Sequence, residues 1–143
     1  MKKALVFLVI ILAFFGCSKE SPKTPQPKVK DINGDRVEVL YFFGKNRCIS
    51  CMNIERYTKE VLDENFSKEI KEGKIVYKMI DYTLTENERI AEKYEVAWSS
   101  LLINKWQNGV ETINDMTAFS FDHTNTNEET FKRVITEKIK SLL

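Results

Sequence analysis

Two cysteines three residues apart, Cys48 and Cys51, are the residues of this chain best suited to chemistry. They follow an apolar, strand-like run and open a helix-like stretch, so both thiols should share the first helical turn. Free backbone N–H groups at a helix start stabilise a thiolate and lower a cysteine pKa from about 8.5 to roughly 3.5–7.5. The spacing lets the two sulfurs close into a disulfide, but so small a loop would stabilise a fold little. The pattern therefore predicts a redox-active dithiol.

Residues 1–16 have the pattern of a signal peptide. Two lysines follow Met1, and residues 4–15 are all apolar. A helix of that length spans about 18 Å, less than the ~30 Å hydrocarbon core, so a membrane-spanning helix is not expected. Gly16-Cys17 resembles the bacterial lipoprotein signal, in which the cysteine is lipidated and becomes the first mature residue. A secretory signal with an incidental free cysteine is the alternative.

The segment after Cys17 predicts where the folded part begins. Residues 17–30 hold all three prolines of the chain and almost no apolar residue, which is typical of an extended linker. We therefore expect a signal peptide over 1–16, lipidated Cys17 and a linker over 17–30, and one folded domain over 31–143. A lipid on Cys17 would anchor the chain in the bacterial cell envelope, facing the periplasm. Ser18 is not the Asp that retains such proteins at the inner membrane, which favours the outer membrane.

Charge and composition exclude several function classes. The chain has 22 basic and 21 acidic residues, and loss of Lys2 and Lys3 with the signal peptide would leave a slightly acidic protein. Such a balance gives no reason to expect a nucleic-acid partner. No flavin or nicotinamide site is recognisable, so no cofactor is expected. The two cysteines of the pair are also too few for a closed structural metal site, which usually has four ligands.

Hydrophobic periodicity predicts an α/β domain. Strands are expected over 36–43, 74–80, 101–106 and 110–113, and helices over 49–72, 85–95 and 128–143, while 114–126 has no clear pattern. Thr85 and Glu88 are spaced as a capping box, Asn108-Gly109 suits a tight hairpin turn, and Trp106 is expected in the core. The first helix should bury a stripe made of Met52, Ile54, Tyr57, Val61, Leu62, Phe66 and Ile70. The order of elements predicts a mixed sheet of about four strands flanked by helices.

A CxxC motif after the first strand of such a sheet is the thioredoxin arrangement, and the chain resembles that superfamily from Val37 to Leu143. The resemblance implies a three-layer fold with the dithiol at the end of the first strand. Within the superfamily the chain is most similar to the ArsF family, thioredoxin-like lipoproteins found beside bacterial arsenic-resistance genes. The similar stretches are residues 41–44, 47–51, 54–55, 59–62, 94–96 and 98–101.

Two residues near the dithiol depart from ordinary thioredoxins in charge. Arg47 stands where thioredoxins have a tryptophan, so the rim of the site would be cationic, favouring the Cys48 thiolate and attracting anionic substrates. A solvated loop arginine is the alternative. Phe42 stands where thioredoxins have a buried Asp that helps to move protons. Glu55, on the same helix face as Cys51, is a candidate for that task, and an ion pair at the surface is its alternative role.

The loop before the third strand departs from the superfamily as well. It reads Trp98-Ser99-Ser100, whereas the resemblance implies a cis-proline that packs against the dithiol and obstructs metal binding. Serines there would leave the dithiol open to a soft metal or metalloid. Trp98 would line the groove beside the dithiol, or else pack in the core.

Two functions follow from these residues. The first is a thiol–disulfide oxidoreductase in which Cys48 attacks a partner disulfide and Cys51 resolves the mixed disulfide. Its partners would be protein disulfides or thiols, together with a membrane electron donor. The second is a dithiol module in which Cys48 and Cys51 bind trivalent arsenic or a soft metal, such as arsenite in arsenic resistance.

Overall fold

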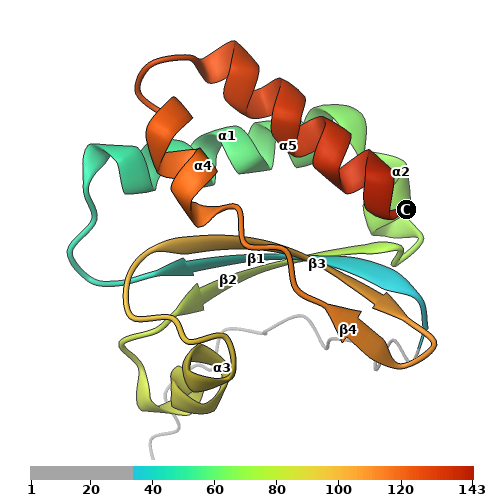
Figure 1. Ribbon diagram of the computed structural model, residues 1–143, viewed down its shortest axis with the longest axis horizontal. Helices are drawn as coiled ribbons and strands as arrows, with labels where there is room; N and C mark the ends of the chain where they lie inside the picture. The colour runs from blue at the N-terminus through green and yellow to red at the C-terminus, as the bar shows by residue number, and fades with distance from the viewer. Residues whose placement is uncertain (1–33) are drawn as a thin grey trace, which may run out of the picture. The chain divides into compact units, whose positions relative to one another are not determined.

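Four strands form one mixed sheet in the computed structural model, which describes residues 34–143 (Figure 1). Their order across the sheet is β2-β1-β3-β4, with β1 parallel to β2, antiparallel to β3, and β3 antiparallel to β4. The bounds are β1 Arg36–Phe43, β2 Ile75–Asp81, β3 Ser100–Gln107 and β4 Val110–Thr112. The expected signal peptide, Cys17 and linker lie outside the described residues. The sheet confirms the predicted α/β class and its thioredoxin-like order of elements.

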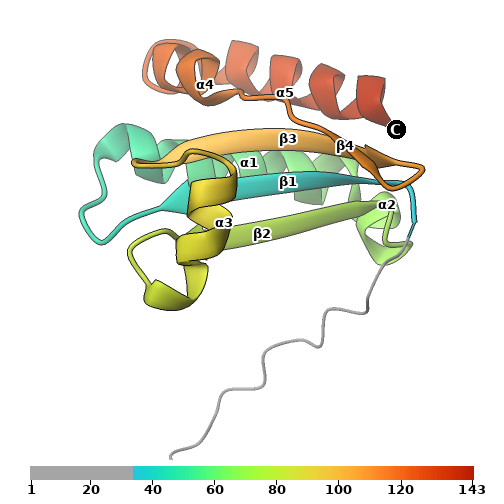
Figure 2. The same cartoon turned by 60° about the horizontal axis from the view of Figure 1, so that its bottom comes forward.

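Helices cover both faces of this sheet, giving three layers (Figures 1 and 2). One face carries α1 (Ile49–Asn65), α4 (Thr117–His123) and α5 (Glu128–Leu142), and the short α2 (Ser67–Lys71) continues α1. The other face carries a 3₁₀ turn, η1 (Thr85–Asn87), followed by α3 (Glu88–Lys93). None of the helices in residues 34–143 is long and apolar enough to cross a membrane.

The strand β1 contributes side chains to the cores on both faces of the sheet. Side chains alternate across a strand, so Val39 and Tyr41 join the core beneath α1 and α5, whereas Leu40 and Phe42 join the smaller core beneath α3. All four are fully buried, which accounts for the continuous apolar run of a strand covered on both faces. The end of β1 is thus a rigid point from which the loop to Cys48 departs.

The helix expected over 49–72 is interrupted at Phe66. Phe66 has φ −133° and ψ 16°, which ends α1, and α2 begins with the next residue. The side chains of Asn65 and Ser67 bond to the carbonyls of Val61 and Asp63, so they compete with regular helix hydrogen bonds. The turn keeps the Phe66 ring in the core at 2% exposure.

Other expectations were wrong in detail. Thr85 does not cap a helix: it opens the 3₁₀ turn after Leu84, and no side-chain cap bond is present there. The stretch 114–126 contains α4, which the sequence pattern did not predict. Met52 is 49% exposed and is not part of the buried stripe of α1. Trp106 is only partly buried, with Arg36 over its ring at 4.8 Å.

Candidate redox site

The two cysteines form a disulfide across the first turn of α1, at the strand-to-helix junction where the sequence placed them. Their Cα atoms are 5.0 Å apart. Cys48 is the N-cap residue in an extended conformation, and its carbonyl accepts the Met52 N–H at 3.0 Å. The Cys51 N–H points at the Cys48 sulfur, with 3.1 Å between nitrogen and sulfur. After reduction, the same N–H would stabilise a negative charge on that sulfur.

The two cysteines differ in their exposure to solvent. Cys48 is exposed, whereas Cys51 is buried at 6% exposure. Thiol–disulfide exchange requires direct contact between the attacking and the attacked sulfur, so access decides which cysteine meets a partner. The geometry therefore offers Cys48 to an incoming disulfide and keeps Cys51 behind it.

Arg47 is neither a free cation nor a solvated loop residue. Its guanidinium pairs with Glu55 on α1 and lies over the ring of Phe43, with its central carbon 5.0 Å from the ring centroid. Only 27% of the Arg47 side chain and 16% of the Glu55 side chain are exposed. Lys59 contacts the same carboxylate at 2.5 Å. Arg47 and Glu55, which were considered separately from the sequence, thus belong to one ion-pair network, in which a single carboxylate serves two cations.

Tyr41 links this network to the dithiol. Its hydroxyl donates to the carbonyl oxygen of Cys51 at 2.7 Å and receives an Arg47 N–H at 3.4 Å. Tyr41 was not among the site residues predicted from the sequence. A signal was available, because a tyrosine inside an apolar central strand needs a partner for its hydroxyl. The strand alternation also directs Tyr41 toward the helix that carries both cysteines.

Burial and the ion pairs fix the ionisation of these groups. Burial by itself would raise the pKa of Glu55, but hydrogen bonds from Lys59 and Arg47 hold that pKa below its usual value. Burial raises the pKa of Tyr41, in spite of the Arg47 hydrogen bond. The Tyr77 hydroxyl of β2 is buried without a hydrogen-bond partner, and burial raises its pKa too. Near neutral pH, Glu55 is therefore a carboxylate and both tyrosines are neutral.

The Trp98-Ser99-Ser100 loop reaches the site through Tyr41. Ser99 is buried at 6% exposure, and it lies close enough to the Tyr41 hydroxyl to oppose the rise in the pKa of that tyrosine. Ser100 begins β3 opposite Phe42, and its hydroxyl donates to the Trp98 carbonyl at 3.0 Å. Trp98 is 63% exposed, so the core-packing alternative for this residue does not hold. All peptide bonds from residue 34 to 143 are trans.

The loop between α4 and α5 touches the dithiol turn from the other side. Asn125 donates to the Ser50 hydroxyl at 2.5 Å and accepts from the Asn53 amide at 3.3 Å. Ser50 lies between the two cysteines, so this loop helps to hold the residues that carry them. No local pattern indicates this contact, because 75 residues separate Ser50 from Asn125.

Apolar side chains stand exposed on the turn that carries the dithiol. Ile49, between the cysteines, is 70% exposed, and Met52 just after them is 49% exposed. Exposed apolar groups beside a reactive atom are typical of a surface that contacts a partner.

Two other features bear on ligands. Residues 34–143 contain no cluster of three or more His, Cys, Asp or Glu side chains that would hold a metal ion.

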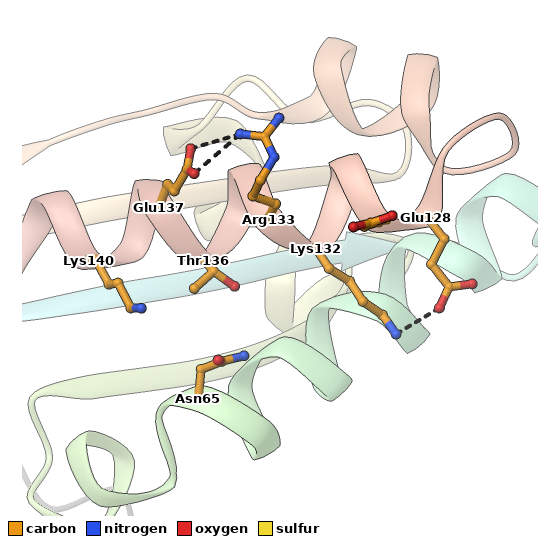
Figure 3. Close-up of a pocket in the computed structure, with 8 residues that line it drawn as sticks. Asn65, Glu128, Lys132, Arg133, Thr136, Glu137 and Lys140 are labelled. Carbon is orange, nitrogen blue, oxygen red and sulfur yellow. Dashed lines mark hydrogen bonds and ion pairs between the residues drawn. The ribbon is translucent and has the colours of Figure 1, made fainter.

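A hollow of about 660 Å³ lies along α5 and reaches Asn65 at the far end of α1 (Figure 3). Four of the charged side chains that line it form ion pairs with one another, Lys132 with Glu128 at 2.7 Å and Arg133 with Glu137 at 3.2 Å. No residue of the dithiol turn lines it.

No family model matches the chain, and no curated protein matches its sequence. Among solved structures, it resembles the Trx4 domain of ERdj5, with 13% identity, a TM-score of 0.49, and coverage of 75% of this chain and 82% of that one. It also resembles Fasciola hepatica thioredoxin, with 22% identity, a TM-score of 0.41, and coverage of 68% and 80% respectively.

Proposed function

We propose that the protein is a thiol–disulfide oxidoreductase acting through Cys48 and Cys51. The observation that carries this proposal is the asymmetric pair itself. An exposed Cys48 sulfur stands at a helix N-cap, and the buried Cys51 is placed to form a disulfide with it. An exposed, stabilised thiolate with a resolving thiol behind it is the arrangement that disulfide exchange requires.

In the reducing direction, the Cys48 thiolate attacks one sulfur of a partner disulfide. The partner's other sulfur leaves as a thiolate and takes a proton from water. Cys51 then loses its proton and attacks the Cys48 sulfur, which releases the partner's second thiolate. Two electrons pass from the pair to the partner, and the Cys48–Cys51 disulfide is formed. The same steps in reverse order oxidise a partner dithiol and reduce the Cys48–Cys51 disulfide.

The proton of Cys51 passes to water in this mechanism. Phe42 occupies the place of the thioredoxin aspartate and is fully buried. Glu55, the other candidate, has a lowered pKa because Lys59 and Arg47 hold its carboxylate. A carboxylate held in this way is a weak base near neutral pH, so Glu55 belongs to the ion-pair network and is not the proton acceptor.

The proposed substrates are protein disulfides or thiols flanked by apolar residues. Ile49, Met52 and Trp98 are exposed on the dithiol turn and on the loop before β3, and they would supply the docking surface. The proposal includes a lipid anchor at Cys17, which would place the domain in the bacterial envelope and require a membrane electron donor. The apolar run of residues 4–15 followed by Gly16-Cys17 supports this, as does the resemblance to the ArsF family.

Capture of trivalent arsenic or a soft metal is the second candidate. The observation that favours it is the short separation of the two cysteines, which lets both sulfurs reach one ion. The third ligand would have to come from a small thiol or another chain, since the described residues offer no such cluster. A pair that stays reduced in excess oxidised glutathione would favour this function.

A covalent trap tests the oxidoreductase proposal in cells. In a Cys51→Ser variant the mixed disulfide cannot be resolved, so partners should accumulate as adducts through Cys48. After acid quenching and thiol blocking, non-reducing gels should show higher-mass bands that a reductant removes.

The matched control is the Cys48→Ser/Cys51→Ser double variant, which should give none of these bands. Adducts that persist in the double variant would arise through another residue. Absence of adducts from the Cys51→Ser variant would contradict the proposal.

A further inference from the structure

The positive charge of an arginine next to a reactive cysteine usually stabilises the cysteine thiolate. In this protein the Arg47 guanidinium also forms an ion pair with Glu55. The Arg47 guanidinium is pinned between Glu55, the Tyr41 hydroxyl and the Phe43 ring. Its Nε atom is buried and has no hydrogen-bond partner, so the side chain is held although one donor is unsatisfied. A buried donor without a partner costs free energy, so its presence in a folded protein calls for an explanation such as a functional role.

The network is connected to the dithiol by a short path. Arg47 immediately precedes Cys48, and its Nη2 donates to the Tyr41 hydroxyl, which donates to the Cys51 carbonyl at 2.7 Å. Glu55 lies one helical turn after Cys51 on α1. Arg47 and Glu55 are thus linked to the dithiol turn by the chain itself and by two hydrogen bonds, and each side chain is less than a third exposed, so their charges are screened less than at an open surface.

We propose that Glu55 sets the reduction potential of the Cys48–Cys51 pair by balancing the charge of Arg47 and fixing its position. Glu55 is a positioning residue here: it acts through Arg47 and need not touch the substrate. This inference rests on the proposed redox function of the pair. The charged or titratable groups that face it are Arg47 from the loop, Lys59 from α1, Tyr41 from β1 and Tyr77 from β2.

The direction of the effect follows from the electron balance. Reduction adds two electrons to the disulfide, leaves Cys48 as a thiolate and adds one proton to Cys51. A nearby positive charge stabilises the thiolate and so favours the reduced form. Glu55 cancels part of this stabilisation, which keeps the pair more reducing than Arg47 alone would make it.

Charge-changing variants with opposite expected signs test the inference. The readout is the equilibrium constant for reduction of the protein disulfide by glutathione. Glu55→Gln should raise this constant by about three- to tenfold, because it leaves Arg47 uncompensated. The upper value corresponds to a potential about 30 mV higher. Arg47→Gln should lower the constant, and the double variant should return it to within about twofold of the wild type.

Glu60→Gln is the matched control. It makes the same charge change on α1 and removes a partner of Lys132, but it lies farther from the cysteines. We expect its equilibrium constant to stay within about twofold of the wild type. Circular dichroism and thermal unfolding verify that each variant is folded.

The inference is overturned if both single variants stay within twofold of the wild type or shift the constant in the same direction. It is also overturned if the double variant fails to restore the constant. A wild-type pair that does not equilibrate with glutathione at all would instead contradict the redox function on which the inference rests.

Discussion

Replacing Cys48 by Ser is expected to abolish catalysed disulfide reduction. With dithiothreitol as electron donor and insulin as the disulfide substrate, the variant should show only the rate measured without protein. The physical reason is that a serine hydroxyl is not ionised at neutral pH and cannot form a disulfide, whereas Cys48 is the exposed sulfur of the pair.

Cys51→Ser distinguishes the two cysteines in the same assay. It retains the exposed nucleophile but cannot resolve the mixed disulfide efficiently. It should therefore consume about one substrate disulfide per protein molecule in a fast first phase and then turn over slowly. Equal first-phase activity in the Cys48→Ser and Cys51→Ser variants would contradict the assignment of Cys48 as nucleophile.

The largest expected effect on stability is at Phe131. Its ring is fully buried between α5, α1 and α4, with centroids 5.7 Å from Tyr57 and 6.3 Å from Phe119. Phe131→Ala should lower the free energy of unfolding by about 3–5 kcal/mol, because it leaves a cavity that three helices cannot collapse to fill. Chemical denaturation followed by circular dichroism measures the loss, which is large beside the ~5–15 kcal/mol of a typical domain.

Val134→Ala on the same helix is the matched control. Val134 is only partly buried, and alanine has the higher helix propensity, so the loss should be about 1 kcal/mol or less. If the two variants lost similar amounts of stability, Phe131 would not be the centre of the core between the helices.

Features carried by strong local patterns could be predicted from the sequence. The apolar run of β1 and the amphipathic stripe of α5 correctly located a strand and a helix, and the Cys48–Cys51 spacing located the dithiol between β1 and α1. Asn108-Gly109 gave the hairpin, since both residues adopt positive φ. Each of these signals depends on residues close in sequence and on a known backbone requirement.

What could not be predicted depends on contacts between distant segments. At the start of α4 the Leu101 N–H donates to the Thr117 hydroxyl at 3.1 Å, a contact between segments 16 residues apart that no local pattern shows. Arg47 was expected to make the rim of the site cationic or to be a solvated loop residue, and its ion pair with Glu55 on α1 was not predicted. Met52 fits the helical stripe by spacing, yet it lies in the first turn of α1 and is exposed.

Redox titration of the wild-type protein tests the central claim most directly. Protein equilibrated with mixtures of reduced and oxidised glutathione would be acid-quenched, alkylated and weighed by mass spectrometry. We expect one reversible transition between a dithiol and an intramolecular Cys48–Cys51 disulfide, following a two-electron couple. A pair that remains fully reduced in excess oxidised glutathione, or that forms only glutathione adducts or linked chains, would contradict the account.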